Sequence, residues 1–158
     1  MKQSGPEPIQ AVDSGPYNRK ENGMSTPPSE LKVITSAKNL NSYLFRMLEN
    51  APKKYRSTIV ARLENDSLSL VECLVRANAI PLGEKRRQDE QTEASVMIKS
   101  IDMLAQLAIE MECLTFHQGE VIGKMLNETS YLLMAWRKSD GKRRSNQYDS
   151  SGASLKKG

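Results

Sequence analysis

Four stretches of the chain repeat apolar residues at the spacing of an amphipathic α-helix. The first carries Leu40, Leu44 and Leu48, begins at Thr35 or Ser36, either of which can cap it, and ends at residues 50–52. The second covers about residues 54–79, and the third covers about residues 84–111. The fourth follows a capping box at residues 115–118 and ends at residues 139–141. The pattern therefore predicts four helices and no strands.

The connections between these helices are only a few residues long, which forces consecutive helices to run antiparallel. The expected fold class is therefore all-α, an antiparallel up-down-up-down four-helix bundle over residues 35–138. Five of the seven prolines fall within residues 1–34, and residues 139–158 are rich in Ser, Gly and basic residues. Such segments bury too little apolar surface to fold, so both flanks are predicted to be disordered, the first as an arm and the second as a basic tail.

The third and fourth helices carry more apolar surface than one bundle core requires. In the third helix a core stripe from Ile98 to Ala108 is continued around the cylinder by further apolar residues, and in the fourth helix two apolar residues lie away from the core stripe. One interpretation is a central helix with irregular patterning. The alternative is an oligomer interface, since contiguous exposed apolar patches usually mark contacts. We favour the interface, with these residues: Met97, Met103, Leu107, Tyr131 and Met134.

The net charge of +4 is unevenly distributed. Basic residues outnumber acidic ones in residues 36–80 and 139–158, whereas residues 81–111 are acidic overall. A single basic cluster is usually a solvated face, but clusters repeated around a symmetric oligomer would attract phosphate backbones without reading sequence. The candidate nucleic-acid-binding residues are Lys53, Lys54, Arg56, Arg62, Arg76, Arg86, Arg87, Arg137, Lys138, Arg143 and Arg144. No exposed aromatic platform for bases is expected.

The sequence offers little catalytic chemistry. His117 is the single histidine, so neither a di-iron site of the bundle type nor a Cys/His zinc site can be assembled, and no phosphate-binding glycine loop is present. We therefore expect no enzyme activity, no metal and no cofactor. Cys73 and Cys113 lie in apolar helical contexts and are predicted to be reduced core residues. No segment resembles a membrane span or a signal peptide, so a soluble, cytoplasmic protein is expected.

Several short segments resemble one family of four-helix bundles, the accessory variability determinant (Avd) proteins of diversity-generating retroelements, which are related to bundle proteins encoded in ribosomal RNA intervening sequences. The resemblance covers about residues 33–138. It rests on segments 33–35 (VIT), 51–56 (APKKYR), 76–78 (RAN), 114–116 (LTF), 122–126 (IGKML) and 135–139 (AWRKS).

The resemblance implies a homopentameric ring of bundles with a basic surface. It also implies two partners, a reverse transcriptase and its template RNA and cDNA, in mutagenic cDNA synthesis. On that basis Lys53, Lys54, Arg56, Arg62 and Arg76 match the basic second-helix region of the family. The alternative function is that of a structural oligomeric bundle of a mobile element, acting through protein contacts only.

Overall fold

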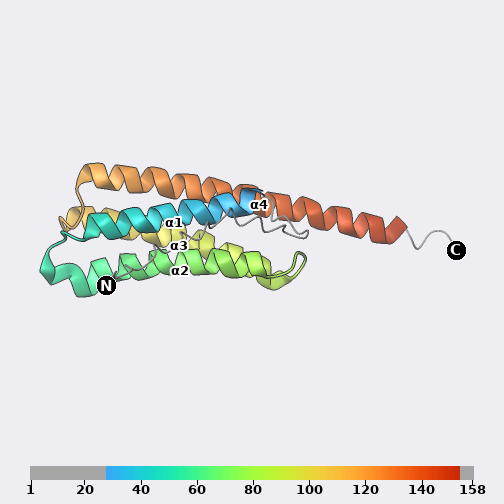
Figure 1. The fold of residues 1–158 in the computed structure, drawn as a ribbon, viewed down its shortest axis with the longest axis horizontal. Coiled ribbons are helices and arrows are strands. Elements are labelled where there is room, and N and C mark those ends of the chain that lie inside the picture. The colour runs from blue at the N-terminus through green and yellow to red at the C-terminus, as the bar shows by residue number, and fades with distance from the viewer. Residues whose placement is uncertain (1–27, 154–158) are drawn as a thin grey trace, which may run out of the picture.

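The computed structural model describes residues 28–153, and within that range it consists of helices joined by short connections. The four main helices are α1 (Pro28–Leu48), α2 (Ala61–Ala79), α3 (Lys85–Glu110) and α4 (Phe116–Ala153). Helix α1 packs on α2 and α4, and α3 packs on the same two helices, so that the four enclose one core (Figure 1). The predicted all-helical fold with four helices is confirmed.

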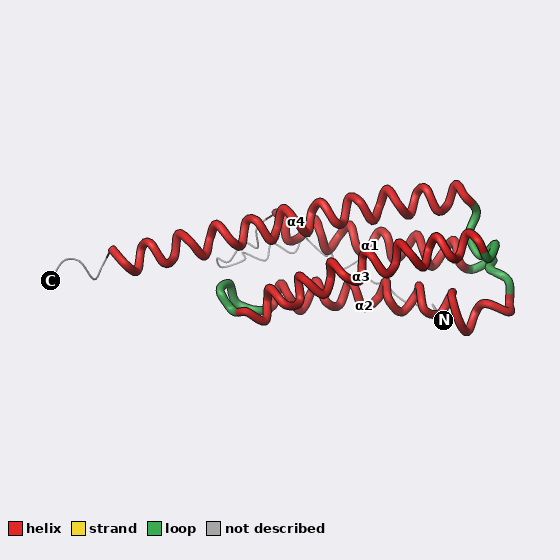
Figure 2. The backbone as a smooth tube through the Cα atoms, turned by 180° about the vertical axis from the view of Figure 1, so that it is seen from behind, coloured by secondary structure: helices red, strands yellow, loops and turns green. Residues whose placement is uncertain are grey.

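The connections lie at the two ends of the bundle (Figure 2). The α1–α2 and α3–α4 connections share one end, which we call the α1–α2 end. The α2–α3 loop lies at the other, here called the α2–α3 end, where α4 continues beyond the rest of the bundle (Figure 1). The α1–α2 connection is itself helical, with a 3-10 turn at Lys53–Tyr55 and a π-helical turn at Arg56–Val60.

The core consists of the apolar stripes that the periodicity predicts. Leu40, Leu44 and Leu48 of α1 are fully buried, and Leu63, Leu70 and Leu74 of α2 belong to the same core cluster. Each such side chain contributes about 1.5–3 kcal/mol by leaving water. Cys73 and Cys113 are buried and unpaired with each other, as predicted. The core is therefore built on the predicted helical spacing.

The first helix begins earlier than the sequence indicates. Residues 28–34, assigned above to a disordered arm, form the first two turns of α1, and Pro28 occupies a position that tolerates a missing N–H. Val33 is fully buried, which ties these turns to the core. Ser36 is not a cap, because its hydroxyl is buried and hydrogen-bonds with Thr129 Oγ1 of α4 at 2.8 Å. Residues 1–27 of the predicted arm lie outside the described residues.

The fourth helix is longer than predicted. It does not end at residues 139–141 but continues to Ala153, so residues 139–153 of the predicted tail are helical. The glycines and serines of this stretch are weak helix formers, but Asp140 is buried and held by side chains of α3. A tertiary contact therefore overrides the local stop signal. Residues 154–158 lie outside the described residues.

The start of α4 follows its sequence signature. Thr115 Oγ1 accepts the backbone N–H of Gln118 at 3.2 Å, and Gln118 Oε1 accepts the backbone N–H of Thr115 at 2.9 Å. This reciprocal pair satisfies two N–H groups that have no intrahelical partner. The predicted capping box is confirmed.

Candidate nucleic-acid interface

A buried charged cluster holds the α2–α3 end together. Arg87 of α3 donates from Nε to Asp140 Oδ2 at 2.7 Å and from Nη2 to Oδ1 at 3.1 Å. Gln91 Nε2 donates to the same Oδ2 at 2.8 Å. Arg87 Nη1 also donates to the carbonyls of Ala77 and Ile80 at the end of α2. One guanidinium thus links α2, α3 and α4.

The Arg87 guanidinium also lies over the ring of Trp136, with 5.1 Å between its central carbon and the ring centroid. Arg87 is only 5 % exposed and Asp140 only 3 %. The prediction of Arg87 as a nucleic-acid-binding residue is therefore wrong, because its guanidinium faces the core and is already bound. The lysine-arginine run at residues 85–87 gave no sign that its third member points inward.

Beyond this cluster, α4 carries a run of basic residues. We call residues 139–153 the α4 arm. Arg137 and Lys138 precede it, and Lys142, Arg143 and Arg144 lie on it. Arg137 donates to Ser95 Oγ and Thr92 Oγ1 of α3, and Arg143 Nη1 lies 3.6 Å from Asp140 Oδ1. Because Arg87 pairs with Asp140, the acidic residue inside this run is already neutralised.

Two further predicted residues, Arg76 and Arg86, lie at this same end of the bundle. Arg76 at the end of α2 pairs with Glu90 of α3 at 3.1 Å and lies near Glu72. The hydrogen bond from Arg76 lowers the pKa of the Glu90 carboxyl, a second hydrogen bond from Cys73 lowers it further, and the charge of Arg86 adds to the effect. Arg76 is therefore largely compensated by carboxylates, whereas Arg86 is exposed.

The remaining basic residues predicted to bind nucleic acid lie away from this group. Lys53, Lys54 and Arg56 occupy the α1–α2 connection at the opposite end, where Lys54 Nζ lies 4.8 Å from the Tyr55 ring centroid. Arg56 donates to the backbone carbonyl of Glu49. Arg62 pairs with Asp66 and lies fourteen residues before Arg76, about 21 Å along α2. The predicted basic residues thus divide into two groups, one at each end.

The predicted interface residues are largely at the surface. Met103 is 72 % exposed, and Tyr131, Met134 and Leu107 are exposed as well. Met97 is different, because it is partly buried and packs against the core. Val96 is also exposed, although the prediction did not select it. Leu68 and Val75 of α2 are exposed in addition, so apolar surface is not confined to α3 and α4.

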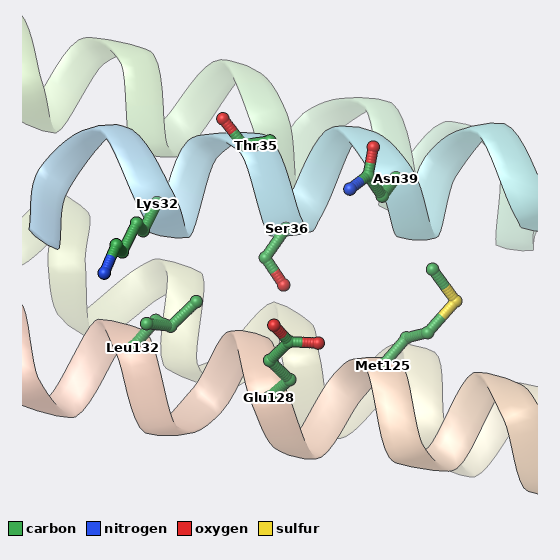
Figure 3. Close-up of a pocket in the computed structure, with 7 residues that line it drawn as sticks. All are labelled: Lys32, Thr35, Ser36, Asn39, Met125, Glu128 and Leu132. Atoms are coloured by element: carbon green, nitrogen blue, oxygen red, sulfur yellow. The ribbon is translucent and has the colours of Figure 1, made fainter. Parts of the chain in front are cut away.

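A groove of about 530 Å³ lies at the surface between α1 and α4 (Figure 3). Lys32, Thr35 and Asn39 line it from α1, and Met125, Glu128 and Leu132 line it from α4. The groove has a lysine on one wall and a glutamate on the other (Figure 3). Ser36, which also lines it, is already hydrogen-bonded to Thr129. Because the groove carries a carboxylate as well as an amine, it has no excess of positive charge for a polyanion. It is therefore a weaker candidate for nucleic-acid binding than the α4 arm.

Within residues 28–153, no group of three or more His, Cys, Asp or Glu side chains is arranged to hold a metal ion. No helix in the described part of the chain combines the length and the apolar composition needed to cross a bilayer. His117 is exposed in the first turn of α4, 3.8 Å from the Glu120 carboxylate. No family model and no curated protein sequence matches the chain.

The fold and the site therefore define a four-helix protein with a basic helical arm. Two arm residues, Lys142 and Tyr148, were not predicted as site residues from the sequence. Both fall in the stretch that was expected to be disordered. The signal for Tyr148 would have been its spacing of four residues from Arg144 on a continuous helix, and for Lys142 the same spacing from Lys138.

Proposed function

We propose that this chain is a non-enzymatic, cytoplasmic nucleic-acid-binding protein that serves as an accessory to the reverse transcriptase of a diversity-generating retroelement. On this proposal it binds the polymerase together with the template RNA and its cDNA and supports mutagenic cDNA synthesis. The observation that carries the nucleic-acid part is the basic run of Arg137, Lys138, Lys142, Arg143 and Arg144, whose internal acid is neutralised by Arg87.

Phosphate backbones are the natural partner for such a surface. Basic side chains on one helix release counterions from a nucleic acid, which gives affinity without sequence specificity and makes that affinity fall steeply with salt. Lys138 and Lys142 are one helical turn apart and both exposed, so they reach phosphates from the same side of α4. The exposed Arg86 at the start of α3 adds charge at this end.

The polymerase partnership rests on the resemblance of residues 33–138 to the Avd proteins, and the four-helix fold agrees with it. This partnership predicts that a reverse-transcriptase gene and a pair of repeats lie beside the gene for this chain. A gene neighbourhood that holds neither would contradict the polymerase role. It would leave nucleic-acid binding as a separate question.

We also propose that the bundle is antiparallel, up-down-up-down, and that it assembles into a homopentameric ring. The alternate positions of the connections support the antiparallel topology.

The register of α3 against α4 bears on the proposed ring. Arg137 bonds with Ser95, and the end of α3 lies next to the start of α4. Met134 and Val96 therefore lie at about the same level along the bundle, which supports a shared apolar surface formed by α3 and α4.

Light scattering tests the assembly. The variant Met103→Lys/Met134→Lys is expected to have a lower mass than the unaltered protein, because it places two charges in that surface. The matched control Leu68→Lys/Val75→Lys introduces the same charges on α2 and is expected to leave the mass unchanged. A monomeric unaltered protein would contradict the proposal, and so would equal masses for the two variants.

Titration of a fluorescently labelled RNA at low and high salt tests nucleic-acid binding. The variant Lys138→Glu/Lys142→Glu is expected to bind more weakly by tenfold or more, and its affinity should depend less on salt because fewer phosphates are neutralised. The control Lys99→Glu/Lys124→Glu makes the same charge change on exposed positions of the bundle and is expected to bind normally. If the unaltered protein does not bind at low salt, nucleic-acid binding is refuted. If both variants bind equally, the basic run of α4 is not the binding surface.

The second candidate is a structural oligomer that acts through protein contacts only. The exposed Met103 and Tyr131 favour it, since they indicate a contact surface independent of charge. A protein that forms the oligomer but fails the RNA titration would fit this candidate and exclude the first.

A further inference from the structure

A second groove lies where the α4 arm passes the α2–α3 loop. Gly83 lines it from the loop, and Arg144, Gln147, Tyr148, Ser150 and Ser151 line it from the arm, around a volume of about 460 Å³. Gly83 has a φ of 100°, which favours glycine at this turn, and a side chain there would meet nothing within 4 Å. The groove is therefore open on the loop side.

Tyr148 is the most exposed of the large apolar side chains in the described part of the chain, at 79 %. It follows Arg144 by four residues and precedes Ser151 by three, so these three side chains share one face of the arm. An exposed aromatic ring beside a guanidinium on a polar helix contributes nothing to the core. No exposed aromatic platform for bases was expected from the sequence, yet the Tyr148 ring is exposed on this face.

We infer that the arm binds single-stranded RNA, with a base stacked on the Tyr148 ring and the neighbouring phosphate held by Arg144. This inference rests on the proposed function and names its ligand. Stacking on aromatic side chains needs unpaired bases, because the faces of paired bases are covered by their neighbours in a duplex. A tyrosine one turn from an arginine supplies both contacts that a single strand requires.

The polar residues of the groove favour RNA over DNA. Ser150 and Ser151 donate their hydroxyl hydrogens to backbone carbonyls of the arm, so each oxygen retains acceptor capacity. Gln147 lies between Arg144 and these serines and carries both donor and acceptor groups. The ribose 2′-hydroxyl can donate to such oxygens, whereas deoxyribose has no equivalent group.

Fluorescence anisotropy with three labelled probes tests the inference: an unstructured 12-nucleotide RNA, the DNA of the same sequence, and a 12-base-pair RNA duplex. The unaltered protein is expected to bind the single-stranded RNA most tightly. Tyr148→Ala should weaken that binding by about 5-fold to 100-fold, the loss measured when one stacking ring is removed. It should leave binding of the duplex unchanged, and Tyr148→Phe should retain the affinity because it keeps the ring.

Phe116→Ala is the matched control, because Phe116 is a similarly exposed ring, at 73 %, at the opposite end of the same helix. Circular dichroism checks that each variant keeps its helix content. If the protein binds RNA but Tyr148→Ala binds as well as Phe116→Ala, the inference is overturned and the proposed function stands. Equal or tighter binding of the duplex or the DNA also overturns it. Failure to bind any of the three probes overturns both.

Discussion

Arg87 and Asp140, 53 residues apart in the chain, form a buried bidentate ion pair at the point where α4 leaves the bundle. The pair joins the first turn of α3 to the beginning of the α4 arm. Gly141 and Ser145 give the arm little helix propensity of its own. An isolated helix of this length and composition would be marginal in water. The ion pair thus helps to set where the basic residues of the arm are presented.

Replacing Asp140 by alanine is expected to destabilise the protein strongly. The change leaves the Arg87 guanidinium buried without its carboxylate, and breaking a buried pair in this way typically costs about 3–5 kcal/mol. Urea unfolding followed by circular dichroism measures the loss. Asp149→Ala removes an exposed carboxylate from the same helix and should change the free energy of unfolding by less than about 0.5 kcal/mol.

The double variant Arg87→Met/Asp140→Leu distinguishes the destabilisation caused by an unpaired buried charge from the net contribution of the ion pair to the free energy of unfolding. It removes both charges, and apolar replacement of a buried ion pair is often close to neutral, so it should be more stable than Asp140→Ala. Equal losses for Asp140→Ala and Asp149→Ala would show that the pair does not anchor the arm.

Two glycines of α4 should respond differently to alanine. At Gly123 an added methyl group would meet nothing within 4 Å, so Gly123→Ala is expected to stabilise the helix by about 0.5–1 kcal/mol. At Gly119 the same group would collide with the side chain of Ile109, whose outer carbons must rotate away. Gly119→Ala should therefore stabilise less than Gly123→Ala, or destabilise. Thermal unfolding of the two variants side by side checks the order, and the reverse order would contradict this packing.

The capping box at the start of α4 should also be measurable. Thr115→Ala removes the acceptor for the backbone N–H of Gln118 and is expected to cost about 1 kcal/mol. Thr35→Ala is the control, because Thr35 is an exposed position inside α1 where alanine is the better helix former. The free energy of unfolding of both variants is measured by chemical denaturation. If Thr115→Ala is at least as stable as Thr35→Ala, the cap does not stabilise the protein.

Cys73 should make stability fall at alkaline pH. Burial, followed by a hydrogen bond and charge repulsion from Glu90, raises the pKa of its thiol from 9.0 to about 12. Between those values the unfolded chain loses a proton that the folded chain keeps, so the free energy of unfolding falls as pH rises. Urea unfolding at pH 8 and pH 10 should show a smaller fall for Cys73→Ala than for the unaltered protein. An identical fall would mean that Cys73 does not titrate differently in the two states.

The sequence by itself determined the four helices, the stripes that form the core and the capping box at Thr115. These features depend on local spacing: Leu40, Leu44 and Leu48 recur at a helical period, and a cap involves residues three apart. The charge pattern also indicated where basic residues concentrate. None of this required knowledge of which helix faces which.

Only the tertiary structure decided which charges are available and where α4 ends. Arg86 and Arg87 are neighbours of the same kind in the sequence, yet one is exposed and the other is buried against Asp140. The reason is that pairing over 53 residues depends on the packing of α3 against α4, which no local pattern encodes. The same contact extends α4 past Gly141 and so places Tyr148 beside Arg144 on a helix rather than in a tail.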